Sequence, residues 1–129
     1  MIIGVGCDIV DSRRILKLYE KSPNALLDRI LSIKEREKFF SFDKNSKKQI
    51  SYLSKRFAAK ESLAKALGLG VGKGLSFANI VVDNDEKGAP YIELPTSFSY
   101  KGYENLKIDI SISDEWPMAM AFVVVSSII

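Results

Sequence analysis

The chain has 129 residues and a formal net charge of +3; 47% of its residues are hydrophobic and 27% are charged. This length and balance predict a single globular domain over residues 1–129 and exclude a disordered or fibrous protein. With no histidine and one cysteine, the chain cannot form a Ser-His-Asp triad, a usual zinc site or an intramolecular disulfide. The start, MIIGVGCDIV, is not a signal peptide, and no apolar run reaches the roughly 18 residues of a membrane span, so we expect a cytoplasmic protein with no membrane partner.

The predicted elements begin with a strand at residues 2–10, whose side chains alternate between two faces. One face is apolar, and the other carries Gly4, Gly6 and Asp8. Because glycine has no side chain, another group can approach this second face closely, beside Asp8. Aspartate is disfavoured inside strands, so Asp8 is interpreted either as a cap for the following helix or as a metal ligand.

Three helices are predicted next, each with a recognisable start. Asp11 or Ser12 caps a helix that runs to about residue 21, and Pro23 opens a second helix that includes residues up to 31. Ser32 and Glu35 form a capping box for a third, which ends near residue 42.

A long helix is predicted from about residue 48 to residue 67, with Gly68 as its stop. Glu61 and Lys65 lie one turn apart at the edge of its apolar face. As an exposed ion pair they would contribute only about 0.2–0.5 kcal/mol, and the alternative is that they hold a substrate. Lys60 falls on the apolar side, where a lysine must extend to solvent or meet an anion.

The second half of the chain is predicted to be mostly strands. The loop GLGVGKG (68–74) follows a helix, so it matches neither a dinucleotide-binding fingerprint nor a phosphate-binding loop. It is interpreted as a flexible connector or as backbone that a ligand can pass closely. The last strand is apolar on both faces, so helices or another subunit should cover both. Strands are expected at 77–83, 90–94, 107–113 and 118–125, with a short helix at 96–106, which gives an α+β class.

Two clusters of basic residues suit anionic partners. The first is interleaved with Tyr52 and Phe57, and three interpretations are open: a solvated face, a cradle for phosphates or a nucleic-acid footprint. The second, near the first helix, is either a solubility feature or a docking face for an acidic protein. The first cluster comprises Lys44, Lys47, Lys48, Lys55, Arg56 and Lys60, and the second comprises Arg13, Arg14, Lys17, Lys21 and Arg29.

The segments GVGCDIV (4–10) and RFAAKESLAKALGLG (56–70) together resemble the holo-acyl-carrier-protein synthase family, the small 4′-phosphopantetheinyl transferases. The resemblance continues through FANIVV, GAPY and ISIS, so it covers essentially the whole chain. It implies the 4′-phosphopantetheinyl transferase fold, in which an N-terminal strand and helices precede an antiparallel sheet packed on a long helix. It also implies a Mg²⁺-dependent enzyme of fatty acid biosynthesis. Such an enzyme transfers the 4′-phosphopantetheine arm of coenzyme A to a serine of apo acyl carrier protein and releases adenosine 3′,5′-bisphosphate. The resemblance further implies a homotrimer with active sites between subunits, and it implies no nucleic-acid partner.

The resemblance also assigns roles to residues. Asp8 and Glu61 would hold Mg²⁺ or Mn²⁺ and would form the catalytic set with Lys65, which would meet the pyrophosphate or assist deprotonation. Because the chain lacks histidine, the base is either Glu61 acting through a water or Lys65 with a lowered pKa. Coenzyme A binding is expected at Lys47, Lys48, Arg56, Lys60, Gly68 and Gly70, and carrier-protein docking at Arg13, Arg14, Lys17 and Arg29.

One position departs from the family's pattern. Where the family commonly has a histidine after S-x-S, this chain has Asp114 after Ser113. A carboxylate cannot donate to a phosphate as a protonated imidazole can, and it repels the phosphate. Either the contact is dispensable, or the basic loop compensates, or Asp114 points elsewhere, and the departure bears on coenzyme A affinity more than on the transfer chemistry. Two alternative functions stay open: a non-catalytic homologue that no longer binds coenzyme A, and a small basic nucleic-acid-binding protein whose affinity would fall steeply with salt.

Overall fold

The structure is a computed structural model that describes residues 1–69 and 75–128. A short 3₁₀ helix, η1 (Phe77–Asn79), follows the fourth α-helix. The other elements, in chain order, are β1 (Ile2–Asp11), α1 (Ser12–Lys21), α2 (Pro23–Ile30), α3 (Ile33–Ser41), α4 (Lys47–Leu67), β2 (Val81–Asn84), β3 (Pro90–Glu93), β4 (Leu106–Glu115) and β5 (Met118–Ser127).

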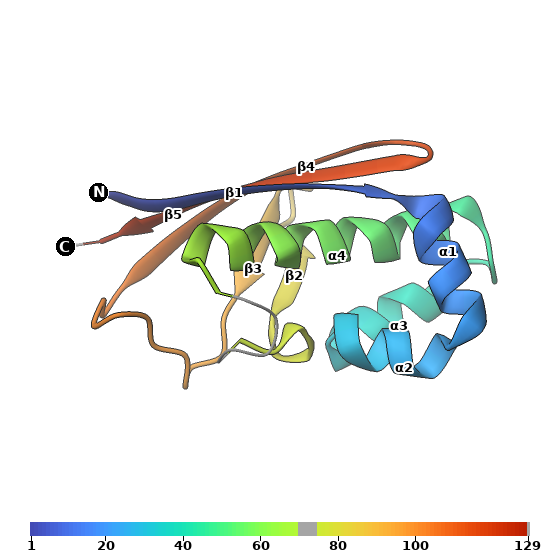
Figure 1. The fold of residues 1–129 in the computed structure, drawn as a ribbon, viewed down its shortest axis with the longest axis horizontal. Helices are drawn as coiled ribbons and strands as arrows, with labels where there is room; N and C mark the ends of the chain where they lie inside the picture. Colours follow the sequence, from blue (N-terminus) through green and yellow to red (C-terminus); the bar gives the residue numbers. More distant parts are fainter. Residues whose placement is uncertain (70–74, 129) are drawn as a thin grey trace.

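The fold is organised around α4, which packs against one face of an antiparallel sheet (Figure 1). The strand order of this sheet is β1-β5-β4, so β1 and β4 are its edges. A second antiparallel pair consists of β2 and β3, and α2 and α3 lie on the side of α4 away from the sheet (Figure 1). This arrangement confirms the predicted α+β class, with an N-terminal strand and helices followed by an antiparallel sheet on a long helix.

The two glycines of β1 allow α4 to lie directly on the strand. A Cβ atom added to Gly4 would lie 1.9 Å from the carbonyl oxygen of Ala66, and one added to Gly6 would lie 1.9 Å from that of Ser62. The predicted close approach to this face is therefore confirmed, and the approaching group is the helix. Asp8 lies two residues further along the same face, so it is brought next to α4.

The helix ends follow the predicted caps. Asp11 caps α1 by accepting a 2.9 Å hydrogen bond from the backbone N–H of Arg13. Ser32 and Glu35 form the capping box of α3. Gly68 ends α4 in the left-handed conformation, with φ of 67°, which glycine adopts without steric cost. In the described parts of the chain, no helix is both long and apolar enough to cross a membrane.

The strand expected at residues 77–83 is only partly present. The segment begins as the 3₁₀ helix η1 and becomes a strand at Val81. The carbonyl of Phe77 already accepts hydrogen bonds from the N–H of Ile80, at 3.2 Å, and from the ammonium of Lys60, at 2.7 Å. It is therefore not available to a neighbouring strand.

The helix expected at residues 96–106 is absent from this described segment, which forms turns. Lys101 and Gly102 both have positive φ, 47° and 75°. Two consecutive residues of this kind reverse the chain and cannot continue a right-handed helix. The flanking Tyr100 and Tyr103 form an isolated β-bridge across the turn.

Candidate active site

The three predicted catalytic residues, Asp8, Glu61 and Lys65, lie in one cleft of about 680 Å³. Residues of β1, α1, α2 and α4 form most of its lining. Asp8 projects from the face of β1 that lies against α4, and the other two come from consecutive turns of α4. The bare glycine face of β1 is what brings these segments, far apart in the chain, into contact.

Lys65 is hydrogen-bonded to Asp8. Its Nζ donates a 2.9 Å hydrogen bond to Asp8 Oδ1 and a 3.0 Å bond to the carbonyl of Cys7. The bond to Asp8 raises the pKa of Lys65 above its ordinary value, and the negative charge of Glu61 adds to the effect. An ammonium with a raised pKa stays protonated near neutral pH and cannot accept a proton from a serine. In this arrangement Lys65 has the charge needed to contact a phosphate, and it lacks the lowered pKa needed for a general base.

The pKa of the Glu61 carboxyl is higher than that of an exposed glutamate. Burial raises its pKa above the ordinary value, and the negative charge of Asp8 raises it further. The positive charges of Lys65 and Arg29 only partly offset these effects. Glu61 and Asp8 therefore repel each other in the absence of a cation.

This pair of carboxylates fits a magnesium-type cation. Asp8 and Glu61 offer hard oxygen ligands, and a divalent cation would relieve the repulsion that raises the pKa of Glu61. Among the described residues, no group of three or more His, Cys, Asp or Glu side chains is placed to hold a metal ion. Mg²⁺ commonly takes one or two carboxylates, with waters and substrate phosphates as its other ligands. The residues present are thus compatible with the expected ion.

The predicted docking residues separate into two sets. Arg14 of α1 and Arg29 of α2 line the cleft together with the carboxylates. Arg13 is turned to its neighbour Asp11, to which its guanidinium donates hydrogen bonds of 2.7 and 3.0 Å. Lys17 is exposed on α1 and does not line the cleft. The positive charge beside the carboxylates therefore comes from Arg14 and Arg29.

The predicted coenzyme A residues Lys47 and Lys48 lie near the other edge of the sheet, beside β4. Two adjoining pockets, which we call the basic pockets, have volumes of about 390 and 300 Å³. Lys47 and Lys48 line the first pocket, and Arg56 lines the second. The residues common to both are Phe42, Tyr52, Lys55 and Asp114.

The guanidinium of Arg56 is held by two neighbouring side chains, but one of its hydrogen-bond donors has no partner among the described residues. Its guanidinium lies 4.5 Å from the ring centre of Tyr52 and donates a 3.1 Å hydrogen bond to Asn84 Oδ1. Its Nε is buried and has no hydrogen-bond partner among the described residues. A buried donor left unpaired costs roughly 1–3 kcal/mol, so Arg56 is kept in this position at a cost to stability.

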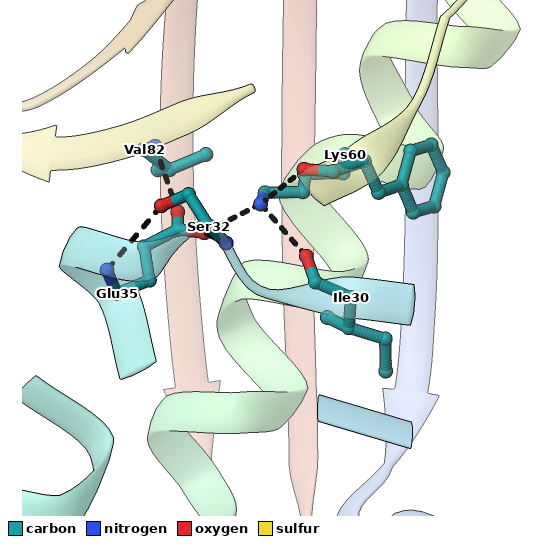
Figure 2. Close-up of polar contacts among 6 residues, drawn as sticks. Ile30, Ser32, Glu35, Lys60 and Val82 are labelled. Atoms are coloured by element: carbon teal, nitrogen blue, oxygen red, sulfur yellow. Dashed lines mark hydrogen bonds and ion pairs between the residues drawn. The ribbon is translucent and has the colours of Figure 1, made fainter. Parts of the chain in front are cut away.

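The prediction that Lys60 binds coenzyme A is wrong. Its side chain is 0% exposed, and its ammonium donates to the carboxylate of Glu35 and to the carbonyl of Ile30 (Figure 2). It also donates to the carbonyl of Phe77. These bonds use all three of its donors. Of the two alternatives expected for a lysine at this helical position, reaching solvent or meeting an anion, the structure shows the second, and the anion is a buried glutamate and not a phosphate.

The structure does not test whether the two glycines expected at the coenzyme A site contact the ligand. Gly68 is exposed, and a Cβ atom added to it would meet no atom within 4 Å. Gly70 lies outside the described residues. Close passage of a ligand along this backbone stays a prediction.

Trp116 is a candidate binding residue that the sequence patterns did not single out. It lies between β4 and β5 and lines the first basic pocket, with its ring 5.5 Å from the ammonium of Lys47. A flat aromatic ring beside positive charge suits a nucleotide base. In the sequence Trp116 appears only within the turn DEWP. The one feature that could have drawn attention to it is its position two residues after Asp114, where this chain differs from the family's pattern.

Comparison with known proteins identifies the family. Residues 4–121 match the family model of the 4′-phosphopantetheinyl transferase superfamily. This chain belongs to that superfamily. It is similar to a holo-(acyl-carrier-protein) synthase of Bradyrhizobium diazoefficiens, with 38% identity over 99% of this chain and 96% of the relative.

Solved structures of the superfamily share the fold. A holo-(acyl-carrier-protein) synthase from Bacillus anthracis, in complex with CoA (3′,5′-ADP), matches with a TM-score of 0.84 at 34% identity, over 99% of both chains. A holo-(acyl-carrier-protein) synthase from Helicobacter pylori, in complex with coenzyme A, matches with a TM-score of 0.78 at 36% identity. That match covers 95% of this chain and 99% of the other.

In this member of the superfamily, the departing residue Asp114 points into the basic pockets. Its carboxylate accepts a 3.1 Å hydrogen bond from the hydroxyl of Ser51 and lies 3.7 Å from the ammonium of Lys55. The acid therefore lies among the cations expected to bind coenzyme A.

Proposed function

We propose that this protein transfers the 4′-phosphopantetheine group of coenzyme A to a serine of apo acyl carrier protein. The products are holo acyl carrier protein and adenosine 3′,5′-bisphosphate. The observation that carries the proposal is the meeting of Asp8, Glu61 and Lys65 in one cleft of a chain of this superfamily. The holo-(acyl-carrier-protein) synthase relatives and the coenzyme A in two related crystal structures support the same substrates. A role in fatty acid biosynthesis and a cytoplasmic location stay predictions.

In this proposal Asp8 and Glu61 hold Mg²⁺, with Mn²⁺ as a possible substitute. When bound, the cation supplies charge neutralisation on the pyrophosphate of coenzyme A. The serine oxygen forms a bond to the phosphorus that carries pantetheine, and the bond from that phosphorus to the 3′,5′-ADP leaving group breaks. Lys65, already protonated, adds a positive charge beside the leaving group. Its raised pKa makes Glu61, acting through a water, the preferred acceptor of the serine proton.

The carrier protein is proposed to dock on Arg14 and Arg29, which flank the carboxylates. Positive charge at this position complements an acidic protein and brings its serine to the cleft. Arg13 and Lys17 lie further along α1. Because Asp11 compensates the charge of Arg13, we expect Arg13 to contribute less than Arg14.

Coenzyme A binding by Lys47, Lys48 and Arg56 is proposed to involve two copies of the chain. The carboxylates lie at the β1 edge and the basic pockets at the β4 edge, about 10 Å away across three strands. Helix α4 packs between them. Coenzyme A carries a pyrophosphate and a separate 3′-phosphate, and a neighbouring copy that offers its basic pockets to the carboxylate cleft would hold both.

The sheet face turned away from α4 supports such an assembly. Val5, Ile9, Met120 and Phe122 are 56%, 62%, 42% and 43% exposed, and cross-strand pairs place them in one patch. Helix α4 covers only the other face of β5, although the sequence predicts that both faces of this strand are covered. Exposed apolar patches of this kind mark protein interfaces. We therefore include in the proposal a homotrimer with active sites between subunits.

Phe122→Glu should dissociate the assembly and abolish most of the transfer. An unpaired carboxylate buried at an interface costs about 3–5 kcal/mol, and a separated copy would lack its neighbour's basic pockets. Sedimentation velocity and a transfer assay on the same sample measure both effects. Ile33→Glu, at an 82% exposed position on α3, is the matched control and should change neither. A Phe122→Glu variant that is monomeric and fully active would contradict the shared site.

The raised pKa of Glu61 gives two pH effects with a defined sign. Cation binding needs the carboxylate, so metal affinity should fall as pH drops through this raised pKa, above the ordinary value of 4.5. In the metal-free protein, a carboxyl with a raised folded pKa favours the folded state only when protonated. Glu61→Gln should therefore leave the urea midpoint at pH 7 in EDTA equal to or above that of the wild type. A clearly lower midpoint would mean that the carboxylate stabilises the fold.

The function itself is tested by incubating the protein with apo acyl carrier protein, coenzyme A and Mg²⁺. Mass spectrometry of the carrier protein should show the added phosphopantetheine arm, and EDTA should abolish the addition. If folded protein gives no product with a range of carrier proteins, the proposed function is wrong. Replacing the acceptor serine by alanine in the carrier protein controls for non-covalent adducts.

A further inference from the structure

Asp114 is the one carboxylate among the described residues that line the two basic pockets. It projects from edge strand β4 on the same side of the sheet as α4, and both of its oxygens are engaged by α4. Ser51 donates to Oδ2 at 3.1 Å, and the ammonium of Lys55 lies 3.7 Å from Oδ1. The remaining charged side chains of the pockets are all cationic: Lys38, Lys47, Lys48, Lys55 and Arg56.

The chemistry of coenzyme A indicates which of its phosphates these pockets would receive. The bond that breaks is in the pyrophosphate, so in the proposed function the pyrophosphate must lie at Asp8 and Glu61. The 3′-phosphate of the ribose is the only other anionic group of coenzyme A. It is therefore the group left for a cationic surface at a separate edge of the sheet.

A carboxylate in this position has two effects on such a ligand. It repels the phosphate directly, and it occupies Lys55, which would otherwise be free to pair with the phosphate. The ion pair is partly exposed, with the two side chains 30% and 40% accessible, so it can be exchanged for a ligand without large cost. Asp114 thus occupies the position beside Lys55 in which the phosphate would pair with that lysine.

We propose that Asp114 is a specificity-determining residue that acts as an internal anion: it competes with the 3′-phosphate of coenzyme A for Lys55 and weakens discrimination between coenzyme A and dephospho-coenzyme A. This inference rests on the proposed function, because coenzyme A is the ligand. It concerns only the affinity for the 3′-phosphate. The transfer chemistry at Asp8 and Glu61 is left unchanged.

The test is an equilibrium titration that uses the single tryptophan, Trp116, which lines the first basic pocket. Its fluorescence is followed while coenzyme A or dephospho-coenzyme A is added to the full-length protein in EDTA, without carrier protein. D114N should bind coenzyme A about threefold to tenfold more tightly than the wild type. Its affinity for dephospho-coenzyme A should change by less than about twofold. Because the effect is electrostatic, the gain should shrink as salt is raised.

Glu115→Gln is the matched control. It removes the same charge one residue further along β4, from a side chain that points to the other side of the strand and lines neither basic pocket. It should leave both affinities unchanged. K55M, alone and combined with D114N, forms a double-mutant cycle: the gain from D114N should be smaller when Lys55 is absent.

An equal change in the two affinities, or an effect of Glu115→Gln as large as that of D114N, would overturn the inference. So would unchanged binding of coenzyme A by D114N. These results are separable from failure of the proposed function, because binding is measured without metal or carrier protein. A protein that binds coenzyme A as expected but transfers nothing would overturn the function alone. A protein that binds neither ligand in EDTA would overturn the inference, and the transfer assay with Mg²⁺ would then decide the function by itself.

Discussion

Asp8→Asn and Glu61→Gln should each lower the rate of phosphopantetheine transfer about a thousandfold while leaving the protein folded. Each variant keeps the shape of the side chain but removes one of the two negative charges proposed to hold Mg²⁺. A bound cation contributes several kcal/mol of charge stabilisation, which corresponds to roughly a thousandfold in rate. The rate is measured by mass spectrometry of the carrier protein, and Mn²⁺ affinity is measured separately by electron paramagnetic resonance. The Mn²⁺ affinity of each variant should be at least about tenfold weaker than that of the wild type.

Asp11→Asn is the control for metal binding. Asp11 is a third carboxylate that lines the same cleft, but it is paired with Arg13, which holds the pKa of Asp11 below its usual value. Asparagine can also replace aspartate as the cap of α1. Mn²⁺ affinity should therefore be unchanged in Asp11→Asn. If Asp8→Asn or Glu61→Gln bound Mn²⁺ like the wild type, that residue would not be a metal ligand.

The meeting of Asp8 with α4 could be predicted from the sequence because local features determine it. Gly4 and Gly6 leave one face of β1 without side chains, and such a face allows the backbone of another element to pack closely against the strand. Asp8 shares that face because side chains alternate along a strand. The caps at Asp11 and Gly68 likewise depend on a few neighbouring residues, and the helix ends agree with them.

The partner of Lys60 could not be predicted, because it depends on contacts between distant parts of the chain. The helical position of Lys60 requires that its ammonium reach either solvent or an anion, and a bound phosphate and a buried carboxylate would serve equally well as the anion. Glu35 lies 25 residues away. The sequence explains this glutamate as part of a capping box, so nothing in the sequence indicates a second role for it. The contact of Asp114 with Ser51 spans 63 residues and was hidden for the same reason. In each case the residue type predicts the need for a partner, and only tertiary packing selects it.

Lys60→Met should lower the free energy of unfolding by about 3–5 kcal/mol, because it leaves the buried carboxylate of Glu35 without its cation. Methionine fills a similar volume, so the loss reports the charge more than a cavity. Two carbonyls also lose their donor, those of Ile30 and Phe77. This is a large share of the roughly 5–15 kcal/mol that stabilises a typical domain. Urea unfolding followed by circular dichroism measures the change.

Lys34→Met is the matched control, since Lys34 forms a 2.8 Å ion pair with Asp83 but is 62% exposed. Exposed pairs contribute about 0–1 kcal/mol, so its loss should be several times smaller. Glu35→Gln should also be costly: the carboxylate it replaces accepts hydrogen bonds from the N–H groups of Ser32 and Val82 as well as from Lys60 (Figure 2). An amide can keep only part of this pattern, because one of its two atoms is a donor. If Lys60→Met instead kept full stability and lost coenzyme A affinity, the buried pair would be secondary and Lys60 would be a ligand-binding residue after all.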